Sequence, residues 1–258
     1  MYDLAGLAKN LEDIRERVAA AAARCGRRAD EITLVAVTKT FPAEAIRAAY
    51  ELGVRHFGEN RVQEFESKER GLDCPEATWH LIGHLQGNKA RRAAQLFHRI
   101  DSVDSVALAQ KLDRLMNEVP DAAEEPPVPT LTPTPGNANR RDVLIEVRLS
   151  DEATKSGVAE AELPAVVAAI AGLSSLRLRG WMTIPPFFEN PEDARPYFRR
   201  MRALRDDLWK GLREGREKAS AGPGVLSMGM SHDFEVAIEE GATEIRVGTA
   251  LFGKRPPI

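Results

Sequence analysis

The sequence has little cysteine, no long hydrophobic run and almost no net charge, and each absence excludes a class of protein. Two cysteines among 258 residues allow at most one disulfide, which excludes a disulfide framework and favours a reducing compartment. A formal net charge of −3 gives no electrostatic basis for binding nucleic acid or a membrane surface. No apolar stretch is long enough to span a bilayer, and the acid-rich N-terminus does not resemble a signal peptide. We therefore expect a cytoplasmic protein.

Strand-like apolar runs alternate with helical segments along most of the chain. The expected strands lie at 33–39, 54–59, 79–85, 99–103, 142–149, 176–184, 225–230 and 244–248. The expected helices between them lie at 43–52, 61–70, 88–97, 105–118, 159–171, 191–214 and 232–240. Strands that are each followed by a helix indicate a parallel α/β fold, either a doubly wound sheet or a barrel. Eight repeats in about 250 residues favour a single-domain (β/α)8 TIM-type barrel spanning 1–258.

Two segments lie outside this alternation. Apolar residues spaced three and four apart near the N-terminus predict an additional helix over 3–24, which ends near Gly26. The stretch PDAAEEPPVPTLTPTP at 120–135 holds six of the chain's 16 prolines and predicts an exposed proline-rich insert at about 120–136. Either segment is a candidate docking surface for enzymes that need a cofactor, although a packed helix and an idle loop are the simpler interpretations.

In a barrel of this type the chemistry lies where the strands end, at the carboxyl face. The first apolar run, ITLVAVTKTFP, ends on Lys39. The last two strands run into SMGMSHD (227–233) and RVGTALFG (246–253), which offer hydroxyl groups and, at Gly248, bare backbone. Loops after strands seven and eight are a common phosphate site in this fold, because free amides and hydroxyls suit a dianion. The sequence therefore predicts a lysine and a phosphate site in one pocket.

A lysine amine in water is almost wholly protonated at neutral pH and is not a nucleophile. Desolvation at a barrel mouth frees its lone pair. An amine beside a phosphate site indicates an aldehyde-bearing phosphate held as a Schiff base on Lys39. Pyridoxal 5′-phosphate meets that description, and a sugar phosphate does too.

Five motifs, VAVTKTFP, FGENRVQE, WHLIGHLQGNK, GWMTIPP and SMGMSHDFEVAIEEGATEIRVGTALFG, together resemble the YggS/PROSC family of pyridoxal phosphate homeostasis proteins. The resemblance covers nearly the whole chain apart from the proline-rich insert. It implies the fold-type III barrel that is shared with the N-terminal domain of alanine racemase. By position, it implies that Lys39 forms the Schiff base and that Ser231, Gly248 and Thr249 form the phosphate cradle.

The resemblance also implies roles for four further residues. Ser227 and Met228 are expected to line the phosphate side, and Asn60 is expected to contact the ring substituents. Asn60 could instead cap the helix that begins near Arg61. Arg246 is expected to face the pyridine nitrogen. Because a guanidinium cannot accept a hydrogen bond, this nitrogen would stay unprotonated and the ring would stabilise a carbanion poorly.

The role that the resemblance implies is to carry, buffer or deliver pyridoxal 5′-phosphate, with effects on amino-acid and keto-acid balance. Racemisation needs a second acid or base, which the alanine racemase relatives take from a C-terminal β-domain. The chain ends at Ile258, shortly after the eighth strand, and none of Tyr2, Tyr50 and Tyr197 is a good substitute. We therefore predict no catalytic residues, and a weak racemase or an aldolase-like enzyme acting on a sugar phosphate remains the alternative.

The histidines do not predict a metal centre. His80 and His84 are four apart in an expected strand and would face the same way, but no third ligand accompanies them. A histidine that is hydrogen-bonded in or near the pocket is the more reasonable expectation. We expect a monomer whose partners are the cofactor and the apo-enzymes that receive it.

Overall fold

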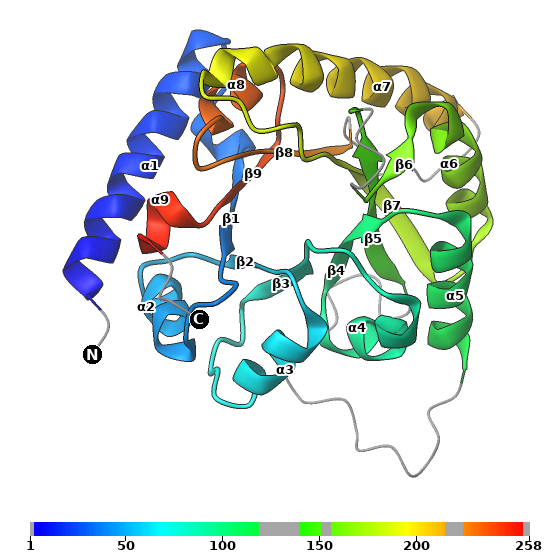
Figure 1. The fold of residues 1–258 in the computed structure, drawn as a ribbon, viewed down its shortest axis with the longest axis horizontal. Helices are drawn as coiled ribbons and strands as arrows, with labels where there is room; N and C mark the ends of the chain where they lie inside the picture. The colour runs from blue at the N-terminus through cyan, green and yellow to red at the C-terminus, as the bar shows by residue number, and fades with distance from the viewer. Residues whose placement is uncertain (1–2, 119–139, 151–155, 215–223, 255–258) are drawn as a thin grey trace.

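Eight parallel strands close into a barrel, which forms the central ring in Figure 1. The computed structural model describes residues 3–118, 140–150, 156–214 and 224–254. Their strands are β1 (Thr33–Val37), β2 (His56–Glu59), β3 (Thr78–Leu81), β4 (Arg99–Val103), β5 (Arg141–Arg148), β6 (Val158–Ala159), β7 (Leu176–Met182), β8 (Val225–Met230) and β9 (Glu244–Val247). The order is β4-β3-β2-β1-β9-β8-β7-β5, and a β4–β5 pairing joins the two ends. The predicted (β/α)8 architecture is confirmed.

An outer ring of helices covers the barrel (Figure 1). The α-helices are α1 (Leu4–Arg24), α2 (Ala43–Glu51), α3 (Val62–Glu69), α4 (Ala90–Leu96), α5 (Val106–Asn117), α6 (Leu163–Gly172), α7 (Arg195–Glu214), α8 (Phe234–Glu239) and α9 (Thr249–Phe252). Short 3-10 helices are η1 (Ala29–Glu31), η2 (Gly87–Lys89), η3 (Glu160–Glu162) and η4 (Pro191–Ala194). The main hydrophobic core lies between the strands and this ring, because outward-facing strand residues such as Phe57 and Trp79 pack against the helices.

The additional N-terminal helix, α1, has clear start and stop signals. The Asp3 side chain caps its first turn by accepting the Gly6 N–H at 2.9 Å. At its end the Gly26 N–H donates to Ala23 O and the Arg27 N–H to Ala22 O, with Gly26 at φ +70°. This is the Schellman pattern, which needs a left-handed residue and therefore favours glycine. The helix packs against α8 and α9 at the periphery of the molecule (Figure 1).

The observed elements differ from the predicted ones mainly at their ends. The strand β6 was not predicted, and it pairs with the carboxyl end of β5. The helix α9 was not predicted either, and it follows directly after β9. The insert at 120–136 lies outside the described residues. None of the described helices is both long and apolar enough to cross a membrane.

Candidate functional site

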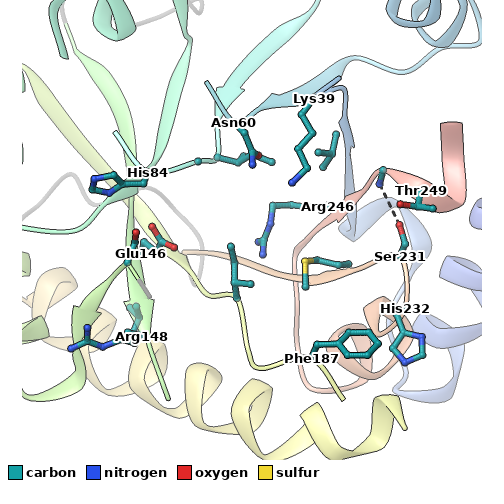
Figure 2. Close-up of a pocket in the computed structure, with 18 residues that line it drawn as sticks. Lys39, Asn60, His84, Glu146, Arg148, Phe187, Ser231, His232, Arg246 and Thr249 are labelled. Atoms are coloured by element: carbon teal, nitrogen blue, oxygen red, sulfur yellow. Dashed lines mark hydrogen bonds between the residues drawn. The ribbon is translucent and has the colours of Figure 1, made fainter. Parts of the chain in front are cut away.

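A cavity of about 710 Å³ opens at the carboxyl ends of the strands. Six of the eight predicted cofactor-binding residues line it: Lys39, Asn60, Ser231, Arg246, Gly248 and Thr249. Figure 2 shows Lys39 extending into this space, with Arg246 at its centre and the residues of the β8 and β9 loops on one side. The parallel barrel brings these residues together although the first and last of them, Lys39 and Thr249, are 210 positions apart in the sequence.

The loops after β8 and β9 form an anion-binding arrangement. The Ser231 Oγ accepts the backbone N–H of Gly248 at 3.3 Å and that of Ala250 at 3.2 Å. Both donors lie at the start of α9, beside the Thr249 hydroxyl, and the first of these bonds is dashed in Figure 2. Two N–H groups that converge on one oxygen atom are the arrangement that a phosphate oxygen would use.

Arg246 is buried in the cavity floor and held rigidly. Its Nη1 donates to Ser227 Oγ and its Nη2 to Thr183 O, each at 2.8 Å. Burial lowers the pKa of Arg246, while the carboxylates of Glu244, Asp101 and Glu146 oppose that shift. A guanidinium has no acceptor atom, so this residue presents only donors and positive charge to the cavity.

Lys39 lies just beyond β1, not within it. The strand ends at Val37, and the chain turns through Thr38 to Thr40, with the Phe41 N–H donating to Thr38 O at 3.1 Å. Thr40 has φ +68°. The prediction that the strand reaches residue 39 is therefore corrected: the turn, rather than the strand, directs this lysine into the cavity.

Ser227 and Met228 do not line the cavity, which corrects the prediction for both. Neighbouring residues of a strand point to opposite faces. Ser227 points inward but lies fully buried beneath Arg246, to which it is hydrogen-bonded. Met228 points outward and is fully buried in the main core, among residues of the helical ring.

Asn60 follows β2, and its side chain is directed into the cavity (Figure 2). The N-cap position of α3 is taken by Arg61, whose side chain makes no cap hydrogen bond. Asn60 is therefore a cavity residue and not a helix cap. The backbone of Asn60 packs tightly against Gly83. A Cβ on residue 83 would lie 2.3 Å from Asn60 O, so this position needs to be glycine.

The cavity wall opposite the phosphate side carries His84, Glu146 and Arg148 (Figure 2). His84 agrees with the expectation of a histidine held in or near the pocket, whereas sequence reasoning missed Glu146 and Arg148. The His84 Nδ1 lies 3.0 Å from Asp104 Oδ2. Glu146 is 7% exposed, and its Oε2 has no hydrogen-bond partner among the described residues. Burial raises the pKa of Glu146 to about 7, with Arg246 opposing the shift and Asp104 supporting it. An acid at the centre of the apolar run VLIEVR is the sequence signal that could have identified this residue.

Phe187, which sequence reasoning missed, and His232, from the predicted SMGMSHD loop, form the rim. Phe187 is 76% exposed, and its ring centroid lies 5.4 Å from that of His232. The His232 Nε2 is 3.0 Å from Glu189 O, which joins the β8 loop to the segment after β7. Phe187 therefore lies where the cavity meets solvent.

His80 and His84 do not face the same way, contrary to expectation, because β3 ends at Leu81 between them. His80 lies at the amino-terminal end of the barrel interior, with its Nε2 3.0 Å from His56 Nδ1. His80, Asp101 and Glu244 could in principle hold a metal ion. However, Arg99 lies 2.6 Å from both carboxylates and already supplies the positive charge that a cation would bring.

The residues present fit pyridoxal 5′-phosphate. Lys39 and the loop residues Ser231, Gly248 and Thr249 line one cavity, as an aldehyde and a phosphate on one molecule require. Arg246 between them supplies a fixed donor at the centre of the cavity, as Figure 2 shows.

Comparison with known proteins agrees with this fit. The chain matches the family described as alanine racemase, N-terminal domain, over residues 3–256. It is 43% identical over 247 residues to the pyridoxal phosphate homeostasis protein of Aquifex aeolicus, covering 96% of this chain and 97% of that protein. The protein of that name from Escherichia coli K12 is 41% identical over 254 residues, covering 96% and 97%.

The solved structure of PipY from Synechococcus elongatus PCC7942 with PLP bound has a TM-score of 0.75 and 36% identity. That match covers 96% of this chain and all of PipY. A likeness of this extent includes the strand ends from which the cavity is built. The chain therefore belongs to the family of pyridoxal phosphate homeostasis proteins, which share the barrel of the alanine racemase N-terminal domain.

Proposed function

We propose that this protein binds pyridoxal 5′-phosphate through Lys39 and carries it, buffering and delivering the cofactor and so influencing amino-acid and keto-acid balance. The observation that carries the proposal is the shared cavity of one lysine amine and one anion-binding loop pair. Relatives that match over almost their whole length are named for this homeostasis, and the related PipY structure contains the cofactor.

When bound, the cofactor would supply an aldehyde that condenses with amines. Lys39 would provide the nitrogen lone pair for that bond, and an incoming amine that replaced it would return the hydrogen that Lys39 needs to become a free amine. Glu146 lies in the same cavity and has a pKa of about 7, so it can release or accept a proton near neutral pH. The open rim at Phe187 gives an incoming amine access to Lys39.

We propose carriage rather than turnover because no tyrosine is among the described residues that line the cavity, so the tyrosine of the alanine racemases has no counterpart there. The two described tyrosines lie elsewhere: the Tyr50 hydroxyl accepts the Glu76 N–H, and the Tyr197 ring packs 5.7 Å from that of Phe188. Arg246 offers no acceptor to keep a ring nitrogen protonated. The site is therefore suited to attachment and release.

We further propose that residues 1–258 act as a single cytoplasmic domain, that the protein is a monomer, and that its recipients are apo-enzymes that use the cofactor. Among the described residues the large exposed apolar side chains are Leu4, Ile184 and Phe187, too few to form an obligate interface. Light scattering on the purified protein tests the monomer. The delivery role is tested by mixing the loaded protein with an apo-enzyme. The cofactor should reach the apo-enzyme faster than it does by release and free diffusion.

The attachment itself is tested by Lys39→Ala. The wild-type protein should take up pyridoxal 5′-phosphate with a visible absorption band, and borohydride reduction should fix the cofactor on a peptide that contains Lys39. The variant should lose both, because no other lysine is among the described residues that line the cavity. The matched control is Lys9→Ala on the exposed side of α1, which should behave like the wild type. A wild-type protein that takes up no cofactor would overturn the proposal.

A further inference from the structure

Both peptide groups that flank Lys39 are held by one buried ionic network behind the cavity. The carbonyl oxygen of Thr38, which belongs to the peptide before Lys39, accepts from Lys68 Nζ at 3.0 Å. The N–H of Thr40, which belongs to the peptide after Lys39, donates to Glu64 Oε1 at 2.5 Å. The two contacts are joined, because Lys68 also donates to Glu64 Oε1 at 2.7 Å.

The network continues into the barrel wall through Glu59. This residue is fully buried, and its Oε1 accepts from Lys68 Nζ at 3.1 Å and from Thr38 Oγ1 at 2.7 Å. Lys68 thus has an acceptor for each of its three ammonium hydrogens: Thr38 O, Glu59 and Glu64. A lysine whose side chain is only 12% exposed needs such complete satisfaction to remain charged.

Charge is balanced within the network. Burial acts to raise the pKa of Glu64, but the hydrogen bonds from Lys68 and from the Thr40 amide lower it below its ordinary value. Glu64 is therefore the carboxylate that neutralises Lys68. Burial raises the pKa of Glu59 to about 7, despite the opposing effect of Lys68. Lys68 thus connects one ionised and one partly protonated carboxyl group to the backbone around Lys39.

The turn that this network holds is strained. Thr40 has φ +68°, and every other described residue with positive φ is a glycine. A β-branched residue in the left-handed region is strained and persists only where its surroundings impose that conformation. The Thr40 amide is the group that Glu64 holds, so the strained residue and the ionic anchor coincide.

We propose that Lys68, Glu64 and Glu59 are positioning residues, which hold the backbone on both sides of Lys39 so that its amine is aimed into the cavity. They act through the Thr38 and Thr40 peptide groups and are not among the residues that line the cavity. The inference rests on the proposed function, because it assigns these three residues to the attachment step. Their loss should weaken attachment at Lys39 and leave the phosphate cradle, on different strands, unchanged.

The main test is Lys68→Met, a variant of similar length without the charge. Two ligands separate attachment from general binding: pyridoxal 5′-phosphate, and pyridoxine 5′-phosphate, which has the phosphate but no aldehyde. We expect attachment of the first to slow by about 10- to 100-fold, as a misplaced reacting group does, and affinity for the second to change less than about twofold. Glu64→Ala, which removes the acceptor of the Thr40 amide at a partly exposed position, should behave in the same way if Lys68→Met does not fold.

A second substitution that relieves the backbone strain at Thr40 should rescue attachment in the Lys68→Met variant. Glycine adopts positive φ without penalty, so Thr40→Gly added to Lys68→Met should restore most of the attachment rate. The inference is overturned if Lys68→Met attaches the cofactor at the wild-type rate, if both ligands lose affinity by the same factor, or if Thr40→Gly gives no recovery. The wild-type protein measured alongside keeps the two proposals apart, because its failure to bind pyridoxal 5′-phosphate would refute the proposed function instead.

Discussion

Glu146 is a carboxylic acid that has been removed from water without full hydrogen bonding. It is 7% exposed, and its Oε2 has no partner among the described residues. Burial raises its pKa to about 7, well above the ordinary value of a glutamate, although Arg246 opposes the shift. Near neutral pH the folded protein therefore binds a proton here that the unfolded chain releases, which links this one residue to stability.

The sign of that linkage predicts the effect of Glu146→Gln. The pKa of Glu146 is higher in the folded state than in the unfolded chain. The stability that its protonated form contributes is therefore fully present below the pKa of the unfolded chain and is lost as the pH rises through about 7. Glutamine mimics the neutral acid, so the variant should be more stable than the wild type. Its free energy of unfolding should be higher by about 3 kcal/mol at pH 8 and by under about 1 kcal/mol at pH 5. Urea unfolding at both pH values measures this. Equal gains at both would contradict it, and the exposed control Glu12→Gln should change neither.

At the scale of elements, α1 is an additional N-terminal helix that packs against the last two described helices, α8 and α9. Its buried stripe includes Ile14, which is fully buried. Arg17 adds a two-pronged ion pair with Glu235, at 3.1 and 3.0 Å, and its guanidinium lies 4.5 Å from the Phe234 ring centroid. The helix therefore joins the first and last parts of the described barrel.

We expect Ile14→Ala to destabilise the protein by about 2–5 kcal/mol, because it leaves a cavity in this contact. Urea unfolding gives the free energy, and the visible band of added pyridoxal 5′-phosphate reports on the site. Binding should be kept at 25 °C, since α1 supplies no residue that lines the cavity. Glu16→Ala on the exposed face is the control. A loss below about 0.5 kcal/mol for Ile14→Ala would show that α1 is not part of the cooperative fold.

The elements were predictable from the sequence, whereas the directions of side chains inside them were only partly so. Continuous apolar runs locate the eight barrel strands, because a buried parallel strand is apolar on both faces. The same property hides which face points inward, so Ser227 and Met228 could both be placed in the cavity, and neither lines it. The turn at Lys39 was missed because the expected strand was carried two residues past the apolar run ITLVAV, which ends at Val37 as β1 does. Glu146 and Arg148 were missed because they belong to the run VLIEVR, which indicated only a buried strand.

At the scale of the whole molecule, an ion cluster spans the barrel interior at its amino-terminal end. Arg99 on β4 contacts Asp101 on the same strand and Glu244 on β9, each at 2.6 Å, and these two strands are not neighbours. Burial alone would raise the pKa of Asp101, but the Arg99 guanidinium holds it below its ordinary range. The stability that this pair contributes is therefore present above the unfolded pKa of an aspartate and is lost as the pH falls into the acid range.

Removal of the Arg99 guanidinium should destabilise the fold, because Arg99 neutralises two buried acids. Arg99→Met leaves Asp101 and Glu244 buried without a counter-charge and should lower the unfolding free energy by about 3–5 kcal/mol at pH 7. The deficit should shrink at pH 4, where protonation neutralises those acids. Urea unfolding at the two pH values tests this, with Arg91→Met, a surface arginine paired with Glu118, as the control. A variant as stable as the wild type at pH 7 would show that the cluster gives no net stabilisation.

The two sides of the cavity are built by different parts of the chain, and this bears on how the protein could be altered. The attachment side comes from the ends of three adjacent strands, β8, β9 and β1, whereas His84 follows β3 and Glu146 and Arg148 belong to β5. Under the proposed function, the β8, β9 and β1 side would hold the cofactor and the far wall would meet the incoming amine. A library confined to His84, Glu146 and Arg148 should then vary which amines exchange with the cofactor, while the residues proposed to hold it stay unchanged.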